Sequence, residues 1–239
     1  MVCLKLRLTA ALMTTPASRI QSRAHSTPRE RVLSDHELKS IWQACDRPGE
    51  VRKPAHTAVK SRSAKVRAKL KPPSLPATFC AIVKLLILTG QRRGEIAALH
   101  KKWLTDDTIT LPSEITKNGR EHTFPIGQLA ASVLQSPTEA SNGAFLFLGR
   151  GDSETCFNGW SKSKVALDSL SGVTNWTLHD LRRTFASNMT ALGVQLHVIE
   201  KLLNHVSGSF SGIVAVYQRH NFMPEMRDAM QRWRRAWES

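Results

Sequence analysis

An apolar run near the middle of the chain most constrains the fold. Residues 81–89 are apolar apart from Lys84 and the final threonine, and the aliphatic side chains recur with helical spacing from about Ala77. Gly90 follows, a residue suited to a left-handed helix cap. The run is too short to span a bilayer. It therefore predicts a buried helix at the centre of a compact core.

Length and charge narrow the class of protein. With 239 residues, the chain is long enough for one large domain or a domain with appendages. Lys and Arg number 34 against 19 Asp and Glu, a net charge of +15. This excess predicts a polyanionic partner, either nucleic acid or an acidic membrane surface, and charge alone does not choose between them.

Two basic stretches lie outside the expected core. The first 29 residues contain no acid and predict a disordered basic tail, with an organellar transit peptide as the alternative. Residues 51–73 carry eight Lys or Arg and no acid, which predicts a surface insertion or linker; the alternative is a strip that contacts phosphates. The predicted organisation is a tail over 1–30 and one domain over 31–239, interrupted at 51–76.

Helical and strand patterns fill the remaining chain. Ser34 and Glu37 form a capping-box pattern before an amphipathic helix, and a short helix is expected from Gly94 to about residue 100. Segments 108–111 and 122–126 predict a hairpin whose connection contains Asn118-Gly119, and 145–148 predicts a further strand. From about residue 159 the pattern is helical. The expected breaks are Gly193, Gly208 and Pro224.

The last predicted helix, residues 224–237, has one apolar and one arginine-rich face. The apolar face fits two arrangements equally well from sequence: packing on its own domain, or docking on a neighbouring protomer.

A histidine and an arginine share one face of a predicted helix start. Thr177 and Asp180 form a second capping-box pattern, which places His179 in the first turn and Arg182 one turn later. Cations near free helix N–H groups hold anions well. The alternative is a surface ion-pair network around Asp180.

Tyr217 is the sole tyrosine and lies twelve residues after His205. A phenol is a nucleophile when a base takes its proton or cations hold the developing charge; the alternative is a packed aromatic side chain. No serine nucleophile elbow, HExxH motif, phosphate-binding loop or dinucleotide fingerprint is present. The four cysteines are scattered without a CxxC pair, so we expect reduced thiols, no zinc site and no disulfide framework.

Five strings, in this order, resemble the tyrosine recombinases, and in particular the phage-type integrases of prophages and genomic islands. They are LLILTGQRRGEI (85–96), TKNGREHTFPI (116–126), HDLRRTFAS (179–187), LLNH (202–205) and VYQRH (216–220). The resemblance implies an α+β fold, a mainly helical catalytic domain with a small antiparallel β-sheet. It also implies site-specific DNA cleavage and rejoining through a 3′-phosphotyrosyl intermediate.

The resemblance assigns roles to four residues around the scissile phosphate. Arg92 and Arg182 would grip its non-bridging oxygens, a task that suits planar guanidinium groups. Tyr217 would attack the phosphorus. Lys117, on the predicted hairpin, would protonate the departing 5′ oxygen.

Three further residues have implied supporting roles. His179 would act as base or proton relay for the tyrosine, and His205 would hydrogen-bond the phosphoryl oxygens in the transition state. Glu95 would orient the site without taking part in the chemistry. No metal ion or nucleotide cofactor is implied, because the protein–DNA bond conserves the energy of the phosphodiester.

The resemblance also sets expectations for partners. It implies double-stranded DNA as substrate, a tetramer on DNA, accessory DNA-bending or directionality factors, no membrane, and a DNA-associated place in the bacterial cytoplasm. Members usually carry a core-binding domain before the catalytic domain, and here about 30 residues precede the match, so we expect a catalytic domain alone. The alternatives are a truncated remnant that binds DNA without catalysing recombination and, as the nearest chemical neighbour, a type IB topoisomerase.

Overall fold

The computed structural model describes residues 30–48, 75–140, 144–149, 152–205 and 221–238. The chain divides into two units, residues 1–30 and 31–239, and every element below belongs to the second. The predicted basic tail, most of the basic insertion and the predicted break at Gly208 lie outside the described residues.

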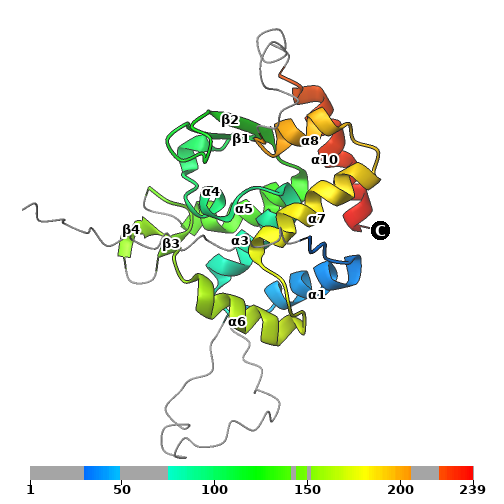
Figure 1. Ribbon diagram of the computed structural model, residues 1–239. Coiled ribbons are helices and arrows are strands. Elements are labelled where there is room, and N and C mark those ends of the chain that lie inside the picture. The colour runs from blue at the N-terminus through cyan, green and yellow to red at the C-terminus, as the bar shows by residue number, and fades with distance from the viewer. Residues whose placement is uncertain (1–29, 49–74, 141–143, 150–151, 206–220, 239) are drawn as a thin grey trace, which may run out of the picture. The chain divides into compact units, whose positions relative to one another are not determined.

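Helix α3 (Ala77–Thr89) is the centre of the core, as Figure 1 shows. Seven of its large apolar side chains are buried: Phe79, Ile82, Val83, Leu85, Leu86, Ile87 and Leu88. Each such burial contributes on the order of 1.5–3 kcal/mol, so this helix is the main hydrophobic anchor. It ends at Gly90, which is left-handed (φ 66°) and donates its N–H to the Leu86 carbonyl at 3.0 Å. The predicted central helix and its cap are confirmed.

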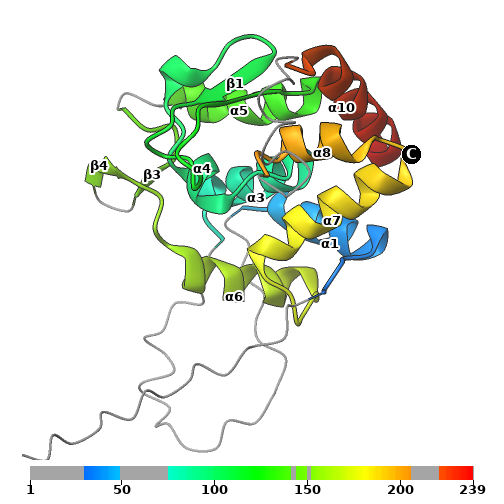
Figure 2. The same cartoon turned by 45° about the horizontal axis from the view of Figure 1, so that its top comes forward.

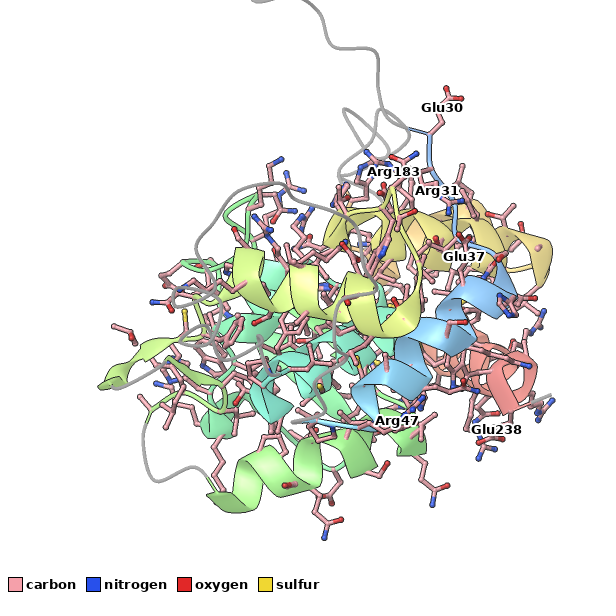
Figure 3. All side chains as sticks on the ribbon, turned by 90° about the horizontal axis from the view of Figure 1, so that it is seen from below. Glu30, Arg31, Glu37, Arg47, Arg183 and Glu238 are labelled. Atoms are coloured by element: carbon pink, nitrogen blue, oxygen red, sulfur yellow. The ribbon has the colours of Figure 1, made fainter. Side chains whose placement is uncertain are left out.

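Helix α1 (Asp35–Cys45) packs on α3 and on α6 (Trp160–Ser171). The predicted capping box is present: the Ser34 hydroxyl accepts from the Glu37 N–H, and the Glu37 carboxylate accepts from the Ser34 N–H. Arg31 and Glu37 form an ion pair at the start of this helix, seen at the edge of the molecule in Figure 3. The described cysteines are free thiols, with Cys45 and Cys80 buried.

The predicted hairpin is confirmed as β1 (Thr108–Leu111) and β2 (His122–Pro125). The strands are antiparallel, with Ile109 opposite Phe124, and both of these side chains are fully buried. The connection covers residues 112–121 and is therefore longer than a two-residue reverse turn; Gly119 in it is left-handed (φ 65°). Helix α4 (Arg93–Ala97) and the 3₁₀ helix η1 (Lys101–Trp103) lead into this hairpin.

The expected strand at 145–148 is largely wrong. Strand β3 is Leu148–Gly149 and pairs antiparallel with β4 (Asp152–Cys156), with an irregular register. Phe145 instead forms an isolated bridge with His100, and the two rings lie 4.4 Å apart. Phe145 is therefore paired with His100 and is not part of β3. Helix α5 (Gln128–Ala140), which the sequence reading did not predict, packs on α3.

The C-terminal half is helical, as predicted. Its remaining elements are α7 (Leu178–Ala191), α8 (Leu196–Leu202) and α10 (Met223–Glu238). Figure 2 shows α10 lying beside α8 and α7. The expected break falls just before Pro224: residues 221–222 are not helical, and Pro224 occupies the first turn of α10, where a missing N–H costs no helical bond.

Helix α10 packs on its own domain. Its buried face consists of Met226, Ala229, Met230 and Trp233. The Trp233 indole donates to the Ile87 carbonyl of α3 at 3.2 Å, and its ring meets Phe185 of α7 edge to face. Of the two arrangements open from sequence, the described residues adopt packing within the domain. None of the helices that the structure describes is long and apolar enough to cross a lipid bilayer.

Candidate active site

Arg182 points from α7 into the core and not into a surface network. Its side chain donates to the carbonyls of Gly90, at the end of α3, and Leu203, just after α8. Asp180 instead pairs with Arg183, which Figure 3 labels, while its other oxygen closes the predicted capping box with Thr177. The ion pair with Asp180 that the sequence left open is therefore formed by Arg183. Arg182 is only 7% exposed.

Arg92 lies in the turn between α3 and α4, where Gly90 reverses the chain. It donates from Nη1 to Glu95 Oε1 at 2.9 Å and from Nη2 to the Asn204 carbonyl at 3.3 Å. Glu95 is buried one turn into the short helix, so the i,i+3 spacing brings its carboxylate back to the guanidinium.

Three successive carbonyls at the C-terminal end of α8, those of residues 202–204, receive long-range donors. The Leu202 carbonyl accepts from Gln91 Nε2 at 2.7 Å and lies 3.1 Å from His122 Nε2. The Leu203 carbonyl accepts from Arg182, and the Asn204 carbonyl accepts from Arg92. His205, the next residue, is exposed. The fold thus brings Arg92 and Arg182 to the backbone segment that immediately precedes His205.

The two guanidinium groups form a cationic centre with one buried carboxylate. Burial, the largest cause, and the positive charge of Arg92 together lower the pKa of Arg182 to about 10, while Glu95 opposes the change. Arg182 therefore stays charged at neutral pH. Each guanidinium has five N–H donors, and the bonds above use two of them. Donors and net positive charge are therefore left for an anion.

His179 stands at the exposed N-terminal end of α7, one turn before Arg182. Partial burial lowers its pKa, the charges of Arg183 and Arg182 lower it further, and Asp180 opposes them. The neutral imidazole is thus favoured at neutral pH, and this is the form that accepts a proton. In Figure 2, the N-terminal end of α7 lies farther from α10 than its C-terminal end does.

Lys117 reaches the site through its backbone. Its N–H donates to Glu95 Oε1 at 3.3 Å, the oxygen that also binds Arg92, while its side chain is exposed. The hairpin loop therefore lies beside the guanidinium centre. Tyr217 lies outside the described residues, so its position stays a prediction.

The sequence reading missed four residues that organise this centre: Gln91, Asn118, His122 and Asn204. Each lies inside one of the strings that carry the family resemblance. Gln91 and His122 hold the Leu202 carbonyl, and Asn118 contacts Asn204. Their partners are 80 or more residues away in sequence, so no local spacing could have indicated these contacts.

Comparison with known proteins bears on this arrangement. The phage integrase family model matches residues 31–223. Prophage integrase IntZ of Escherichia coli (strain K12) is 31% identical over 192 residues, which cover 73% of this chain and 46% of that protein. The tyrosine recombinase XerC of Roseiflexus sp. (strain RS-1) is 32% identical over 146 residues, 56% of this chain and 45% of that protein.

Among solved structures, a lambda integrase(75–356) dimer bound to a COC′ core site has a TM-score of 0.54 at 18% identity. The match covers 80% of this chain and 63% of that one, and it supports the mainly helical fold with its small antiparallel hairpin. The chain spans about half the length of the curated relatives that it matches. On the family model, which covers most of its residues and every described site residue, the chain belongs to the phage integrase family.

Proposed function

We propose that residues 31–239 form a catalytic domain that cleaves and rejoins DNA strands at specific sites through a 3′-phosphotyrosyl intermediate. The observation that carries the proposal is the pairing of Arg92 and Arg182 on adjacent carbonyls immediately before His205. Membership of the phage integrase family and the names of the similar integrase and recombinase relatives support it.

The guanidinium pair suits a scissile phosphate. Phosphoryl transfer places extra negative charge on the non-bridging oxygens, so prepositioned donors are the main catalytic requirement. Arg92 and Arg182 are fixed by their carbonyl bonds before any substrate arrives. Loss of one such donor costs about 2.7–4 kcal/mol of barrier in comparable enzymes. His205, next to the Asn204 carbonyl, adds a donor to the same oxygens.

The bonds and protons balance in each direction. The Tyr217 oxygen forms a bond to phosphorus while the bond from phosphorus to the 5′ oxygen breaks. The phenol proton passes to His179, whose lowered pKa keeps it ready to accept it. Lys117 gives a proton to the leaving 5′ oxygen. Rejoining reverses these steps, with the free 5′ hydroxyl as nucleophile.

The proposed partners follow from this chemistry and from the charge of +15. They are duplex DNA and further copies of the chain, with a tetramer as the state that exchanges strands. The similar lambda integrase structure is a dimer bound to a core site, which supports assembly on DNA. Accessory DNA-bending or directionality factors and a DNA-associated place in the bacterial cytoplasm complete the proposal.

A nicked suicide substrate tests the function. Cleavage near a nick releases a short oligonucleotide, so rejoining is blocked and the covalent protein–DNA adduct accumulates. We expect an adduct from the full chain and none from Tyr217→Phe, which lacks only the nucleophilic oxygen. DNA retention without any adduct would support the non-catalytic remnant. Relaxation of supercoils without recombination of two sites would support a topoisomerase.

A further inference from the structure

Two asparagine side chains join the hairpin loop to the segment that follows α8. Asn118 Nδ2 donates to Asn204 Oδ1 at 2.7 Å, and Asn204 Nδ2 donates back to Asn118 Oδ1 at 3.1 Å. Asn118 Nδ2 also lies 3.3 Å from the Asn204 carbonyl. Figure 1 shows the β1–β2 hairpin beside α8, consistent with these contacts. A reciprocal amide pair fixes both distance and orientation between the two segments.

The backbone conformation of Asn204 favours this pairing. Asn204 is left-handed, with φ 48°, a conformation that asparagine adopts more readily than most residues with a side chain. In this conformation its carbonyl accepts from Arg92 while its amide faces Asn118. One residue therefore serves the guanidinium centre and the hairpin loop at once.

The amide pair closes a ring of contacts around the candidate site. Glu95 Oε1 accepts from both Arg92 and the Lys117 N–H, Arg92 reaches Asn204, and Asn204 pairs with Asn118. Lys117 and Asn118 are thus fastened one after the other, the first through its backbone and the second through its side chain. The Lys117 side chain is exposed, so its direction depends on how the loop is held.

We propose that Asn118 and Asn204 are positioning residues that hold the loop so that the Lys117 ammonium meets the leaving 5′ oxygen. The inference rests on the proposed function, in which Lys117 is the general acid. It predicts that loss of the amide pair slows proton transfer to the leaving group and leaves DNA binding and the arginine contacts unchanged.

A leaving group that needs no protonation separates positioning from general structural damage. Two suicide substrates are compared, one with the normal 5′ bridging oxygen at the cleavage site and one with sulfur in its place. A thiolate leaves readily without a proton because its conjugate acid is far more acidic than an alcohol. A defect confined to general-acid catalysis therefore disappears on the sulfur substrate.

The variants are Asn118→Ala and Asn204→Gly, with Lys117→Ala as the reference and Asn188→Ala as the control. Glycine at 204 removes the amide and keeps the left-handed backbone. Asn188 lies near the C-terminal end of α7, where it lines a pocket together with residues of α1 and α10. Asn118→Asp, which keeps the side-chain volume and removes the donor to Asn204, serves if Asn118→Ala does not fold.

On the oxygen substrate we expect Lys117→Ala to reduce the cleavage rate by about 10²–10⁴-fold, which is the rate enhancement that a general acid usually provides. Asn118→Ala and Asn204→Gly should lose at least about tenfold, and Asn118→Ala should add nothing to Lys117→Ala, because both act on one step. On the sulfur substrate all three should approach the wild-type rate. Asn188→Ala should match wild type on both.

Equal losses on both substrates, or no loss on either, would overturn the positioning role while the wild-type adduct upholds the proposed function. Absence of adduct from the wild type on both substrates would overturn the proposed function, and this inference with it.

Discussion

Arg92 and Arg182 donate to neighbouring carbonyls, those of Asn204 and Leu203, at the point where the chain leaves α8. The two arginines start 90 residues apart in sequence and meet on consecutive peptide groups. A pair of proposed phosphate ligands is therefore also a structural clamp. Substitutions at these positions should affect folding stability and catalysis together, to different degrees.

Arg182→Ala and Arg92→Ala should each lower the free energy of unfolding by several kcal/mol, for different reasons. Arg182 is buried and satisfies two buried carbonyls, so its loss should cost about 2–6 kcal/mol, from roughly 1–3 kcal/mol for each group left without a partner. Arg92→Ala leaves the buried Glu95 carboxylate without its guanidinium partner, which should cost about 3–5 kcal/mol. Urea unfolding followed by circular dichroism measures both. Arg234→Ala on the exposed side of α10 is the control and should change stability by less than about 0.5 kcal/mol. A cost below about 1 kcal/mol for either site arginine would contradict the clamp.

Gly90→Ala should be far more damaging than Gly172→Ala. Both glycines cap helices with φ near 70°, so both substitutions carry a similar backbone strain of about 1–2 kcal/mol. A Cβ at position 90 would also lie 2.4 Å from Phe185 Cδ1 and 2.9 Å from Leu203 Cδ2, whereas one at 172 meets nothing within 4 Å. Overpacking adds about 1–3 kcal/mol. Thermal unfolding of the two variants gives the comparison, and similar melting temperatures would contradict the close packing at Gly90.

His122 should make the protein less stable in mild acid. Burial lowers its pKa to about 4, with the charges of Arg182 and Arg92 acting in the same direction and the Leu202 carbonyl opposing them. Between that value and the ordinary 6.5, the unfolded chain binds more protons than the folded one, so stability falls as pH falls from about 6.5 to 4. The full loss is about 3 kcal/mol.

The test compares urea midpoints at pH 5 and pH 7.5. His122→Gln removes the titrating group and can still donate to the Leu202 carbonyl, so its stability should depend less on pH than that of the wild type. His36→Gln, on the exposed face of α1, should keep the wild-type dependence. His179, whose pKa is also lowered, leaves a residual slope in both variants. An unchanged slope in His122→Gln would exclude His122 as its source.

Local patterns predicted what local interactions determine. The apolar run before Gly90 and the capping boxes at Ser34 and Thr177 depend on neighbours within a few residues, and all are confirmed. The hairpin strands, whose paired residues lie 11 to 17 positions apart, are also confirmed. The strand expected at 145–148 failed because Phe145 is held by His100, a partner 45 residues away.

The same limit applies to the site. Spacing placed His179 and Arg182 on one helical face, but it could not show that Arg182 turns inward to the Gly90 carbonyl, 92 residues away. Nor could it pair Asn118 with Asn204, since an asparagine in a turn pattern is explained by the turn alone. The family resemblance supplied the residues, and tertiary packing supplies their mutual geometry.

Glu95→Gln should weaken the fold and make it responsive to anions. Glu95 is 3% exposed; its Oε1 accepts from Arg92 and from the Lys117 N–H, and its Oε2 is buried without a hydrogen bond among the described residues. Glutamine keeps the shape and removes the negative charge that, among the described residues, pairs with Arg92 and acts electrostatically on Arg182. The loss should approach the roughly 3–5 kcal/mol of a broken buried ion pair.

Sulfate should restore part of that stability, because an anion that binds the folded state stabilises it by mass action and the arginine centre of the variant has lost its counter-charge. Sulfate also stabilises proteins in general by exclusion from their surface, so Glu114→Gln in the exposed hairpin loop sets the baseline. We expect the rise in melting temperature with sulfate to be larger for Glu95→Gln than for Glu114→Gln or the wild type. An equal rise in all three would mean that the guanidinium centre does not bind tetrahedral anions, and the proposed grip on a scissile phosphate would lose its physical basis.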